Sequence, residues 1–536
     1  MTDIAREYKK LCPSVPIWVG GPEVSYEVEA FLRENPYIDG VMIGEGEDTF
    51  RELCGYYAHK RKLSDIAGIA FRKNSTGNST SVNNIGGNKA GEIVFTSPRP
   101  IKNMSEIPFC YDTLDDFSNR IIYYESSRGC PFSCSYCLSS VDKTLRFRDT
   151  EIVKKELKFF IDQKVPQIKF VDRTFNCNHA HAMELWRFIK ANDNGVTNFH
   201  FEISADLLNQ EELELISDMR PGLIQLEIGV QSTNDVTIKE IHRTMKLERL
   251  KEVVRLIQSG NNIHEHLDLI AGLPYEDYDS FGRSFDEIYE LKPNQLQLGF
   301  LKVLKGSYMF EHAAEYGIVY HDKPPYEVMS TKWLSFDDVI KIKRVEEMLE
   351  VYYNSGQFEI TMKLMECIFD SAFEFFQELG DFYEANGYFG MSHSRIRRCE
   401  ILLEFLALYL HGCDSDDMAS VGLSGNAGDR DNTDFDENAQ IYKMIQESLI
   451  FDLYYRENCK SRPVWATDIG SFKHMTHAYC KNGKLSHVEP FHYIFPDKHT
   501  RKLDELPKYH KEPVWALFHY DMRDPLDHQA LVEYIE

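Results

Sequence analysis

The sequence lacks any apolar run long enough to span a membrane. No stretch of its 536 residues reaches the about 18 continuous apolar residues that a span requires, and the opening MTDIAREYKKLC has no apolar core of a secretory signal. Positive charge is also scarce, because 60 Lys and Arg against 85 Asp and Glu leave a net charge of −25. A chain with this charge repels phosphate groups, so we expect neither a membrane protein nor a nucleic-acid substrate.

Grouped cysteines are absent everywhere except in one segment. Most of the 12 cysteines are scattered singly, which does not suggest a disulfide framework and fits a reducing cytoplasm. The exceptions are Cys130, Cys134 and Cys137, in the spacing C-x3-C-x2-C. A structural zinc site is the plainer alternative, but it needs four ligands, and no second cysteine pair exists. Three thiolates on a cubane of four irons leave one iron open to chelate a substrate or cofactor.

The motif resembles that of the radical S-adenosylmethionine (AdoMet, SAM) superfamily, including the aromatic Tyr136 just before the third cysteine. The resemblance implies that Cys130, Cys134 and Cys137 hold a 4Fe-4S cluster and that AdoMet chelates the open iron. It further implies a one-electron reductant such as flavodoxin or ferredoxin. The electron would cleave the sulfonium of AdoMet, and the resulting 5′-deoxyadenosyl radical would abstract hydrogen.

Residues 121–320 alternate short apolar strands with amphipathic helices, a pattern typical of a parallel barrel. The expected strands are 121–125, 167–172, 199–203, 223–228, 264–270 and 295–301. The expected helices are 151–163, 180–192, 211–219, 247–259 and 278–291. Six strands suggest a partial barrel that is open on one side, as in the radical AdoMet family. Catalytic residues of such barrels lie at the carboxyl ends of the strands, where the cysteines also fall.

Polar residues near the ends of strands two to five are candidates for binding AdoMet. Glu202, Gln231, Arg243 and Asp268 resemble motifs of the oxygen-independent coproporphyrinogen oxidase and its relatives. The resemblance implies that Gln231 and Asp268 hold the ribose hydroxyls, and that Glu202 and Arg243 address the methionine end. Asp172, after strand two, takes the amino-group role or faces the substrate. The plainer alternatives are an exposed helix charge for Arg243 and a strand-end salt bridge for Glu202.

The first 72 residues also alternate helices (5–11, 28–35, 49–61) and strands (16–19, 40–43). Glycines follow both strands, in Gly20-Gly21-Pro22 and in Gly44-Glu45-Gly46-Glu47, and such strand ends receive phosphates and cofactors in α/β sheets. The region resembles the second half of the cobalamin-binding domain that precedes many radical AdoMet enzymes, which implies that Gly20 and Gly21 lie against the cofactor's nucleotide tail. The domain's first strands and its Asp-x-His-x-x-Gly loop are missing. We therefore expect an internal start, a trimmed chain or degraded cobalamin binding.

Helices predominate beyond about residue 338, and their order resembles a C-terminal domain of unknown function attached to some cobalamin-type radical AdoMet proteins. The expected helices are 345–354, 362–380, 401–411 and 440–455, and the expected strands are 464–466, 491–495 and 514–520. Two polar stretches, 74–88 and 414–438, are predicted to be an exposed loop and a disordered acidic loop.

The sequence thus predicts an α/β protein of four parts. They are a truncated Rossmann-like cobalamin-binding region (1–72), a linker (73–115), a partial (β/α)6 radical AdoMet barrel (116–337) and a mainly helical α+β C-terminal domain (338–536). The predicted function is cobalamin-associated methylation or rearrangement of an unactivated carbon in a small-molecule or peptide substrate. One alternative keeps the radical chemistry with a vestigial cobalamin region. The other is a non-enzymatic iron–sulfur protein for electron transfer or oxygen sensing, which would have no use for AdoMet-binding residues.

Overall fold

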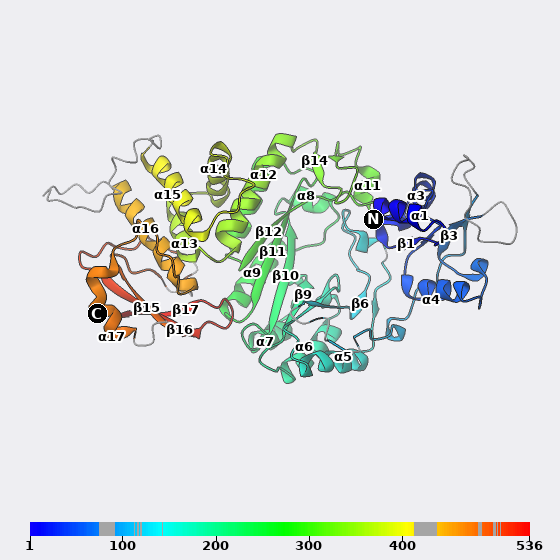
Figure 1. Cartoon of the computed structure of the whole chain (residues 1–536), viewed down its shortest axis with the longest axis horizontal. Coiled ribbons are helices and arrows are strands. Elements are labelled where there is room, and N and C mark those ends of the chain that lie inside the picture. The colour runs from blue at the N-terminus through cyan, green and yellow to red at the C-terminus, as the bar shows by residue number, and fades with distance from the viewer. Residues whose placement is uncertain are drawn as a thin grey trace. The chain divides into compact units, whose positions relative to one another are not determined.

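The structure is a computed structural model, and the chain forms two compact units whose elements are labelled in Figure 1. The described residues are 1–73, 92–111, 113–114, 117, 120–141, 143–411, 437–480, 485–496, 500, 502–503 and 505–535. The first unit comprises Met1–Ser118, Glu125–Phe159 and Val303–Ala314, and the second comprises Asn119–Tyr124, Phe160–Lys302 and Glu315–Glu536. The predicted loop at 74–88, and almost all of the one at 414–438, lie outside the described residues.

The first unit contains a four-stranded sheet and several helices. The sheet order is β1 (Trp18–Gly20), β2 (Gly40–Met42), β3 (Ile69–Arg72) and β4 (Ile93–Phe95). The helices are α1 (Thr2–Leu11), α2 (Pro22–Ser25), α3 (Val28–Glu34) and α4 (Gly46–Tyr57). Helices α1, α3 and α4 overlap the helices predicted for the N-terminal region, whereas α2 was not predicted. Strands β1 and β2 are parallel, whereas β3 and β4 are antiparallel to their neighbours.

Strand β4 lies within the range that we expected to be a linker. Its apolar triplet Ile93-Val94-Phe95 suits a strand, and it pairs with β3 so that Val94 lies opposite Phe71. The sheet of the N-terminal region therefore continues past residue 72. The boundaries between the four predicted parts stay a prediction.

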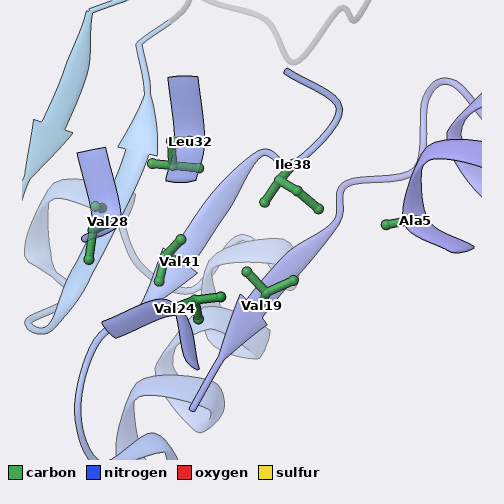
Figure 2. Close-up of a cluster of buried hydrophobic side chains, with 8 residues drawn as sticks. Ala5, Val19, Val24, Val28, Leu32, Ile38 and Val41 are labelled. Carbon is green, nitrogen blue, oxygen red and sulfur yellow. The ribbon is translucent and has the colours of Figure 1, made fainter. Parts of the chain in front are cut away.

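A small apolar core holds the helices of this region against the sheet, as Figure 2 shows. Val28 and Leu32 are one helical turn apart on α3, and both are buried. They pack in one cluster with Val19 of β1 and Val41 of β2. This core fixes the two parallel strands whose ends carry the glycine turns.

The second unit contains a six-stranded parallel sheet, and all six predicted strands are present. The sheet order is β12 (Gln295–Phe300), β11 (His264–Ala271), β10 (Ile224–Gln231), β9 (Asn198–Ile203), β8 (Gln167–Phe170) and β5 (Ile122–Tyr124). The intervening helices are α5 (Thr150–Asp162), α6 (His179–Ala191), α7 (Gln210–Ser217), α8 (Asp235–Glu240), α9 (Leu247–Ser259) and α10 (Tyr278–Tyr289). Strands β5 and β12 form the two edges, which confirms the predicted partial barrel.

Alternation along the strands gives this sheet one apolar and one polar face. In β10 the residues Ile224, Leu226, Ile228 and Val230 are buried, and the residues between them are only partly buried. On the apolar side, the ring centroids of Phe170 in β8 and Phe201 in β9 lie 4.6 Å apart. The opposite, polar face carries the candidate site.

Helices predominate in the C-terminal part, which confirms the predicted mainly helical region. The α-helices are α12 (Phe336–Leu349), α13 (Glu359–Ile368), α14 (Ala372–Ala385), α15 (Arg395–His411), α16 (Glu437–Arg456) and α17 (Lys473–Tyr479). An antiparallel sheet follows, in the order β15 (Ser486–Phe491), β16 (Val514–Arg523) and β17 (Ala530–Ile535). In the part of the chain that the structure describes, no helix is both long and apolar enough to cross a bilayer.

Several elements of this part differ from the prediction. Residues 464–466 form a turn closed by a 3.2 Å hydrogen bond from Ala466 N–H to the Pro463 carbonyl, and Val464 is fully exposed. The expected helix 362–380 is two helices, because the Ser371 side chain accepts the N–H of Glu374 and starts α14 anew. The strand expected at 491–495 occurs earlier, as β15, and β17 was not predicted.

Candidate active site

The three motif cysteines lie in one loop of the first unit, between the short antiparallel strands β6 (Ser127–Arg128) and β7 (Arg146–Phe147). Cys130 and Cys134 are buried and Cys137 is partly exposed, with Tyr136 beside it. The Ser140 hydroxyl donates to the carbonyls of Cys134 and Cys137, at 2.9 and 2.6 Å. The loop therefore folds back on itself and keeps the second and third cysteines one turn apart.

Gly129 allows this loop to close. Its φ is +94°, and a Cβ at this position would lie 2.6 Å from the carbonyl oxygen of Thr144 on the returning arm. Any side chain at position 129 would therefore combine backbone strain with a clash against the main chain. The glycine that precedes the first cysteine is a requirement of the local backbone.

The cysteine donors suit an iron–sulfur cluster better than a single metal ion. Among the described residues, no three or more His, Cys, Asp or Glu side chains gather in a way that could hold one metal ion. A mononuclear zinc site needs such convergence, whereas a 4Fe-4S cluster takes one thiolate at each of its separate irons. Cys130, Cys134 and Cys137 would be these three thiolates.

Two arginines on the arms of the loop contact the glutamate of the Gly44–Glu47 turn. Oε1 of Glu45 lies 3.1 Å from Nη1 of Arg128 and 2.7 Å from Nη1 of Arg146. Arg128 also pairs with Glu47 at 2.9 Å and with Glu125 at 2.7 Å. The sequence predicts this turn only as a strand-end glycine motif, and it does not reveal the contacts of the acidic residues.

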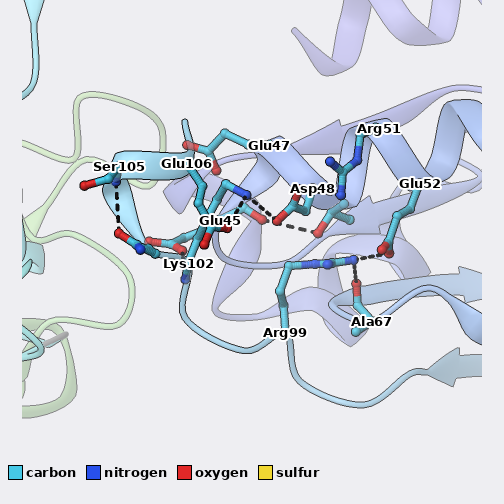
Figure 3. Close-up of polar contacts among 12 residues, drawn as sticks. Glu45, Glu47, Asp48, Arg51, Glu52, Ala67, Arg99, Lys102, Ser105 and Glu106 are labelled. Carbon is cyan, nitrogen blue, oxygen red and sulfur yellow. Dashed lines mark hydrogen bonds and ion pairs between the residues drawn. The ribbon is translucent and has the colours of Figure 1, made fainter. Parts of the chain in front are cut away.

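A further hydrogen bond keeps Glu45 ionised in this network. Its second carboxylate oxygen accepts the N–H of Lys102 at 3.0 Å, and Figure 3 shows the two residues side by side. Burial by itself would raise the pKa of Glu45, but the hydrogen bonds from Lys102, Arg146 and Arg128 outweigh it and the net pKa is lowered. Glu45 is therefore an anion held between two cations.

The predicted cobalamin glycines lie at the carboxyl end of β1. Gly21 follows Gly20 with φ +103°, and Gly44 follows the neighbouring parallel strand β2 with φ +75°. A Cβ at Gly21 or at Gly44 would meet nothing within 4 Å. The two strand ends thus share one open edge of the sheet, as a cofactor loop requires. The assignment of Gly20 and Gly21 to cobalamin stays a prediction.

In the second unit, the polar face of the six-stranded sheet carries a group of ionisable side chains. Glu202 on β9 lies opposite Glu227 on β10. Oε2 of Glu227 is 2.8 Å from Nζ of Lys169 and 2.9 Å from Nε2 of His200. Glu227, Lys169 and His200 are not among the site residues predicted from the sequence. The sequence pattern that could have identified them is the alternation of polar and apolar residues along the strands.

Two of the carboxyl groups on this face hold protons more strongly than usual. Burial, with the charge of Glu227, raises the pKa of Glu202 to about 7. Burial also raises the pKa of Asp268 well above its usual range, with Glu227 and Glu202 adding to the effect. The close contact with His200 lowers the pKa of Glu227 to about 2 against the effect of burial, with help from Lys169. Asp172, predicted beside this group, is fully buried just after β8.

Gln231 and Arg243 meet at Gly229, near the end of β10. Gln231 has a φ of +77° after a bulge, and its side-chain amide occupies the space that a Cβ on Gly229 would need. Arg243 donates from Nη2 to the carbonyl of Gly229. Gly229 itself lies opposite Asp268 on β11. These contacts place three of the predicted AdoMet residues around one glycine.

Two buried oxygens at this place are unsatisfied. Oε1 of Gln231 and Oδ1 of Asp268 have no hydrogen-bond partner within the described parts of the chain. Oδ1 of Asp268 lies 3.2 Å from Nε2 of His266, but without the alignment of a hydrogen bond. Each unsatisfied buried group costs about 1–3 kcal/mol, so such groups call for an explanation. A ligand that supplies hydroxyl groups would satisfy both, as the predicted ribose contacts require.

Comparison with known families accounts for most of the chain. The profile of the radical SAM superfamily matches residues 124–288, and that of the B12 binding domain matches residues 1–54. A family described as a protein of unknown function (DUF4080) matches residues 314–529. The predicted 4Fe-4S cluster and AdoMet follow from the radical SAM match, and the B12 match supports cobalamin as a third candidate cofactor.

Similar proteins include two with methyltransferase names. An uncharacterized methyltransferase of Pyrococcus horikoshii is 25% identical over 63% of this chain and 71% of its own length. The cobalamin-dependent radical SAM methyltransferase TokK of Streptomyces tokunonensis is 26% identical over 54% of this chain, which spans only 42% of that relative. The solved structure of the cobalamin-dependent AdoMet radical enzyme OxsB with aqua-cobalamin bound has a TM-score of 0.50 at 16% identity. That similarity covers 85% of this chain and 71% of OxsB, and it shows the fold alone.

The three profile matches follow one another along the chain in the order that the sequence predicted. The chain therefore combines a B12-binding region, a radical SAM domain and a C-terminal domain of the DUF4080 family.

Proposed function

We propose that this radical SAM protein is an enzyme that methylates or rearranges an unactivated carbon of a small-molecule or peptide substrate, with cobalamin as a partner cofactor. The observation that carries the proposal is the cysteine loop, which offers three thiolates to a cluster of four irons. The B12-binding region and the methyltransferase names of the relatives support the methylation part.

The cysteine loop and the polar sheet face would have separate tasks. When bound at Cys130, Cys134 and Cys137, the cluster supplies the electron that cleaves AdoMet, with flavodoxin or ferredoxin as its source. Gln231 and Asp268 would hold the ribose hydroxyls with the two oxygens that are otherwise unsatisfied.

Glu202 and Arg243 would bind the amino and carboxylate groups at the methionine end of AdoMet. A carboxyl group with a pKa of about 7 needs little free energy to ionise at neutral pH. An ammonium group beside Glu202 would therefore make it an anion and form a charge-assisted hydrogen bond. Arg243, held at the Gly229 carbonyl, would provide the positive charge for the carboxylate of AdoMet.

A radical SAM enzyme with a vestigial cobalamin region is the second candidate. The N-terminal sheet favours it, because only β1 and β2 are parallel and β1 forms an edge. Hydrogen abstraction alone would then drive the reaction. The alternative of a purely electron-carrying iron–sulfur protein explains the polar face less well. Such a protein binds no ligand that would give the buried oxygens of Gln231 and Asp268 a hydrogen-bond partner.

Anaerobic reconstitution tests the proposal. The chain would be loaded with iron and sulfide, reduced with dithionite and incubated with AdoMet, and 5′-deoxyadenosine would be measured by mass spectrometry. We expect release of 5′-deoxyadenosine by the parent protein and by the control Cys110→Ala, whose cysteine is exposed. We expect neither cluster nor product from Cys130→Ala, Cys134→Ala or Cys137→Ala. Product release at the parent rate by one of these three variants would refute the radical assignment.

A further inference from the structure

The hairpin that carries the cysteine loop brings two positive charges face to face. Strands β6 and β7 pair over only two residues each, and Arg128 lies directly opposite Arg146. So short a two-stranded ladder has little stability of its own, and like charges at opposing positions reduce that stability further. The arms of the loop therefore need an anion between them.

Glu45 supplies this anion from outside the hairpin. A single oxygen, Oε1, lies within 3.1 Å of both guanidinium groups, while the other oxygen accepts the Lys102 N–H. The side chains of Glu45 and Arg128 are both largely buried, at 21% and 24% exposure, so solvent screens the contact only in part. Glu125 and Glu47 pair with Arg128, whereas Glu45 pairs with both arginines.

The N-terminal region reaches the same loop by a second route. Glu27 pairs with Lys305 at 3.3 Å, and Gly306 packs so closely against the ring of Tyr26 that a Cβ there would overlap it. A few residues further on, the N–H of the buried Met309 donates to the carbonyl of Ser135 at 2.9 Å. The loop is thus contacted on one side by Glu45 and on another by a segment that the same region holds.

We propose that Glu45 is a positioning residue for the cysteine loop, and that it couples the N-terminal α/β region to the cluster. The mechanical part, closure of the hairpin arms by Glu45, does not depend on any cofactor. The electrostatic part rests on the proposed function. Removal of the Glu45 charge leaves Arg128 and Arg146 less neutralised next to the cluster, and the added positive potential favours the reduced cluster.

Hydrogen–deuterium exchange of the cluster-free chain tests the mechanical part. We compare Glu45→Gln with Glu52→Gln, a matched control on helix α4, which begins just after Glu45. The carboxylate of Glu52 pairs with Arg99 (Figure 3) and with Arg61 instead. We expect amide exchange across residues 126–148 to be roughly tenfold faster in Glu45→Gln, as the loss of a charge-assisted hydrogen bond predicts. We expect no change there in Glu52→Gln. Equal exchange in the two variants would overturn the proposal.

Potentiometric titration of the cluster-loaded protein tests the electrostatic part. We expect a more positive midpoint potential for Glu45→Gln than for the parent and Glu52→Gln. A potential that does not move, or one that moves equally in Glu52→Gln, would overturn the coupling to the cluster. If the chain binds no cluster, the proposed function is refuted. The exchange experiment on the cluster-free chain would then still decide whether Glu45 positions the cysteine loop.

A second variant keeps the test valid if Glu45→Gln does not fold. Arg146→Gln removes one of the two opposing charges, so the double variant Glu45→Gln/Arg146→Gln has no like-charge pair left to neutralise. We expect the double variant to fold and its residues 126–148 to exchange more slowly than in any soluble fraction of Glu45→Gln. Exchange at least as fast as in the single variant, or a double variant that is also unfolded, would overturn the proposal.

Discussion

The side-chain amide of Asn354 makes both of the main-chain hydrogen bonds that Leu296 offers at the edge of the six-stranded sheet. Leu296 N–H donates to Oδ1 of Asn354 at 2.9 Å, and Nδ2 of Asn354 donates to the Leu296 carbonyl at 2.8 Å. Leu296 lies on β12, which has a neighbouring strand on one side only. Asn354 therefore makes the two hydrogen bonds that a residue of a neighbouring strand would otherwise make. An edge strand whose main-chain groups are unpaired can pair with another chain, and this contact reduces that tendency at Leu296.

Replacement of Asn354 by Ala is therefore expected to lower the free energy of unfolding by about 1–3 kcal/mol, since it leaves the N–H and the carbonyl of Leu296 without their hydrogen-bond partner. Urea denaturation followed by circular dichroism measures this. Asn386→Ala is the control, because that exposed side chain donates only to a carbonyl of its own helix. An equal decrease in the free energy of unfolding in the two variants would show that the contact between Asn354 and Leu296 does not stabilise the sheet edge.

Gln231→Ala and Asp268→Ala are each expected to weaken AdoMet binding while the cluster stays intact. Each removes a hydrogen bond to ribose, worth about 0.5–1.5 kcal/mol or more where a partner is left buried. Isothermal titration of the cluster-loaded protein with AdoMet gives the affinities, with the exposed Gln163→Ala as control. Unchanged affinity in both variants would mean that the ribose site lies elsewhere.

Stability should depend on pH through Glu202. Its pKa is raised from an unfolded value near 4.5 to about 7, so the folded chain binds more protons than the unfolded chain between these values. The contribution of Glu202 to stability is therefore present below about pH 4.5 and is lost as the pH rises through about 7. Glu202→Gln should be more stable than the parent at pH 8 by about 1–3 kcal/mol, and the difference should shrink toward pH 5. A difference that is constant from pH 5 to pH 8 would contradict the raised pKa.

The strands and helices of the barrel could be predicted because their local patterns agree with their packing. Helix α9 begins and ends at the predicted residues, Leu247–Ser259, and every predicted strand of the parallel sheet is present. Pattern alone failed where tertiary contacts decide. Val464 and Trp465 favour a strand, but no strand among the described residues pairs with this segment. Ser371 starts a new helix inside a continuous apolar pattern.

The candidate site divides in the same way. Spacing in the sequence was enough to propose Cys130, Cys134 and Cys137 as cluster ligands, because all three lie in one short loop. Glu45 could not be found in this way, since its role depends on arginines more than 80 residues further along the chain. The Glu227–Lys169–His200 group was missed for a similar reason, because three separate strands must pair before these side chains meet.

Gly129→Ala is expected to abolish cluster binding, because the new Cβ clashes with the Thr144 carbonyl across the hairpin. Iron and sulfide content after reconstitution measures the effect. Gly387→Ala separates backbone strain from the clash, because Gly387 also has a positive φ (+65°) but no atom within 4 Å of a Cβ. A Gly129→Ala protein that retains the parental iron content would contradict the steric argument.

Cobalamin binding by this chain is expected to be weak. Strand β1 is an edge of the N-terminal sheet, and Ile4 and Leu11 on α1 are 75% and 83% exposed, so apolar surface near the sheet is uncovered. Equilibrium dialysis against hydroxocobalamin, with free cobalamin as reference, decides the point. Stoichiometric tight binding would contradict this prediction and strengthen the methylation proposal over the vestigial-cobalamin alternative.

The packing of Gln231 over Gly229 has an evolutionary consequence. The amide of Gln231 fills the space above Gly229, so a mutation that adds a side chain at position 229 is tolerated only if residue 231 becomes smaller or turns away. Neither single substitution is expected to be neutral, because a side chain at position 229 clashes and a smaller residue at position 231 removes the proposed contact with ribose. Substitutions at positions 229 and 231 should therefore accumulate slowly during evolution, and they should occur together. Selection from a library randomised at both positions would reveal this as co-variation, with bulk at 229 recovered only alongside loss of the amide at 231.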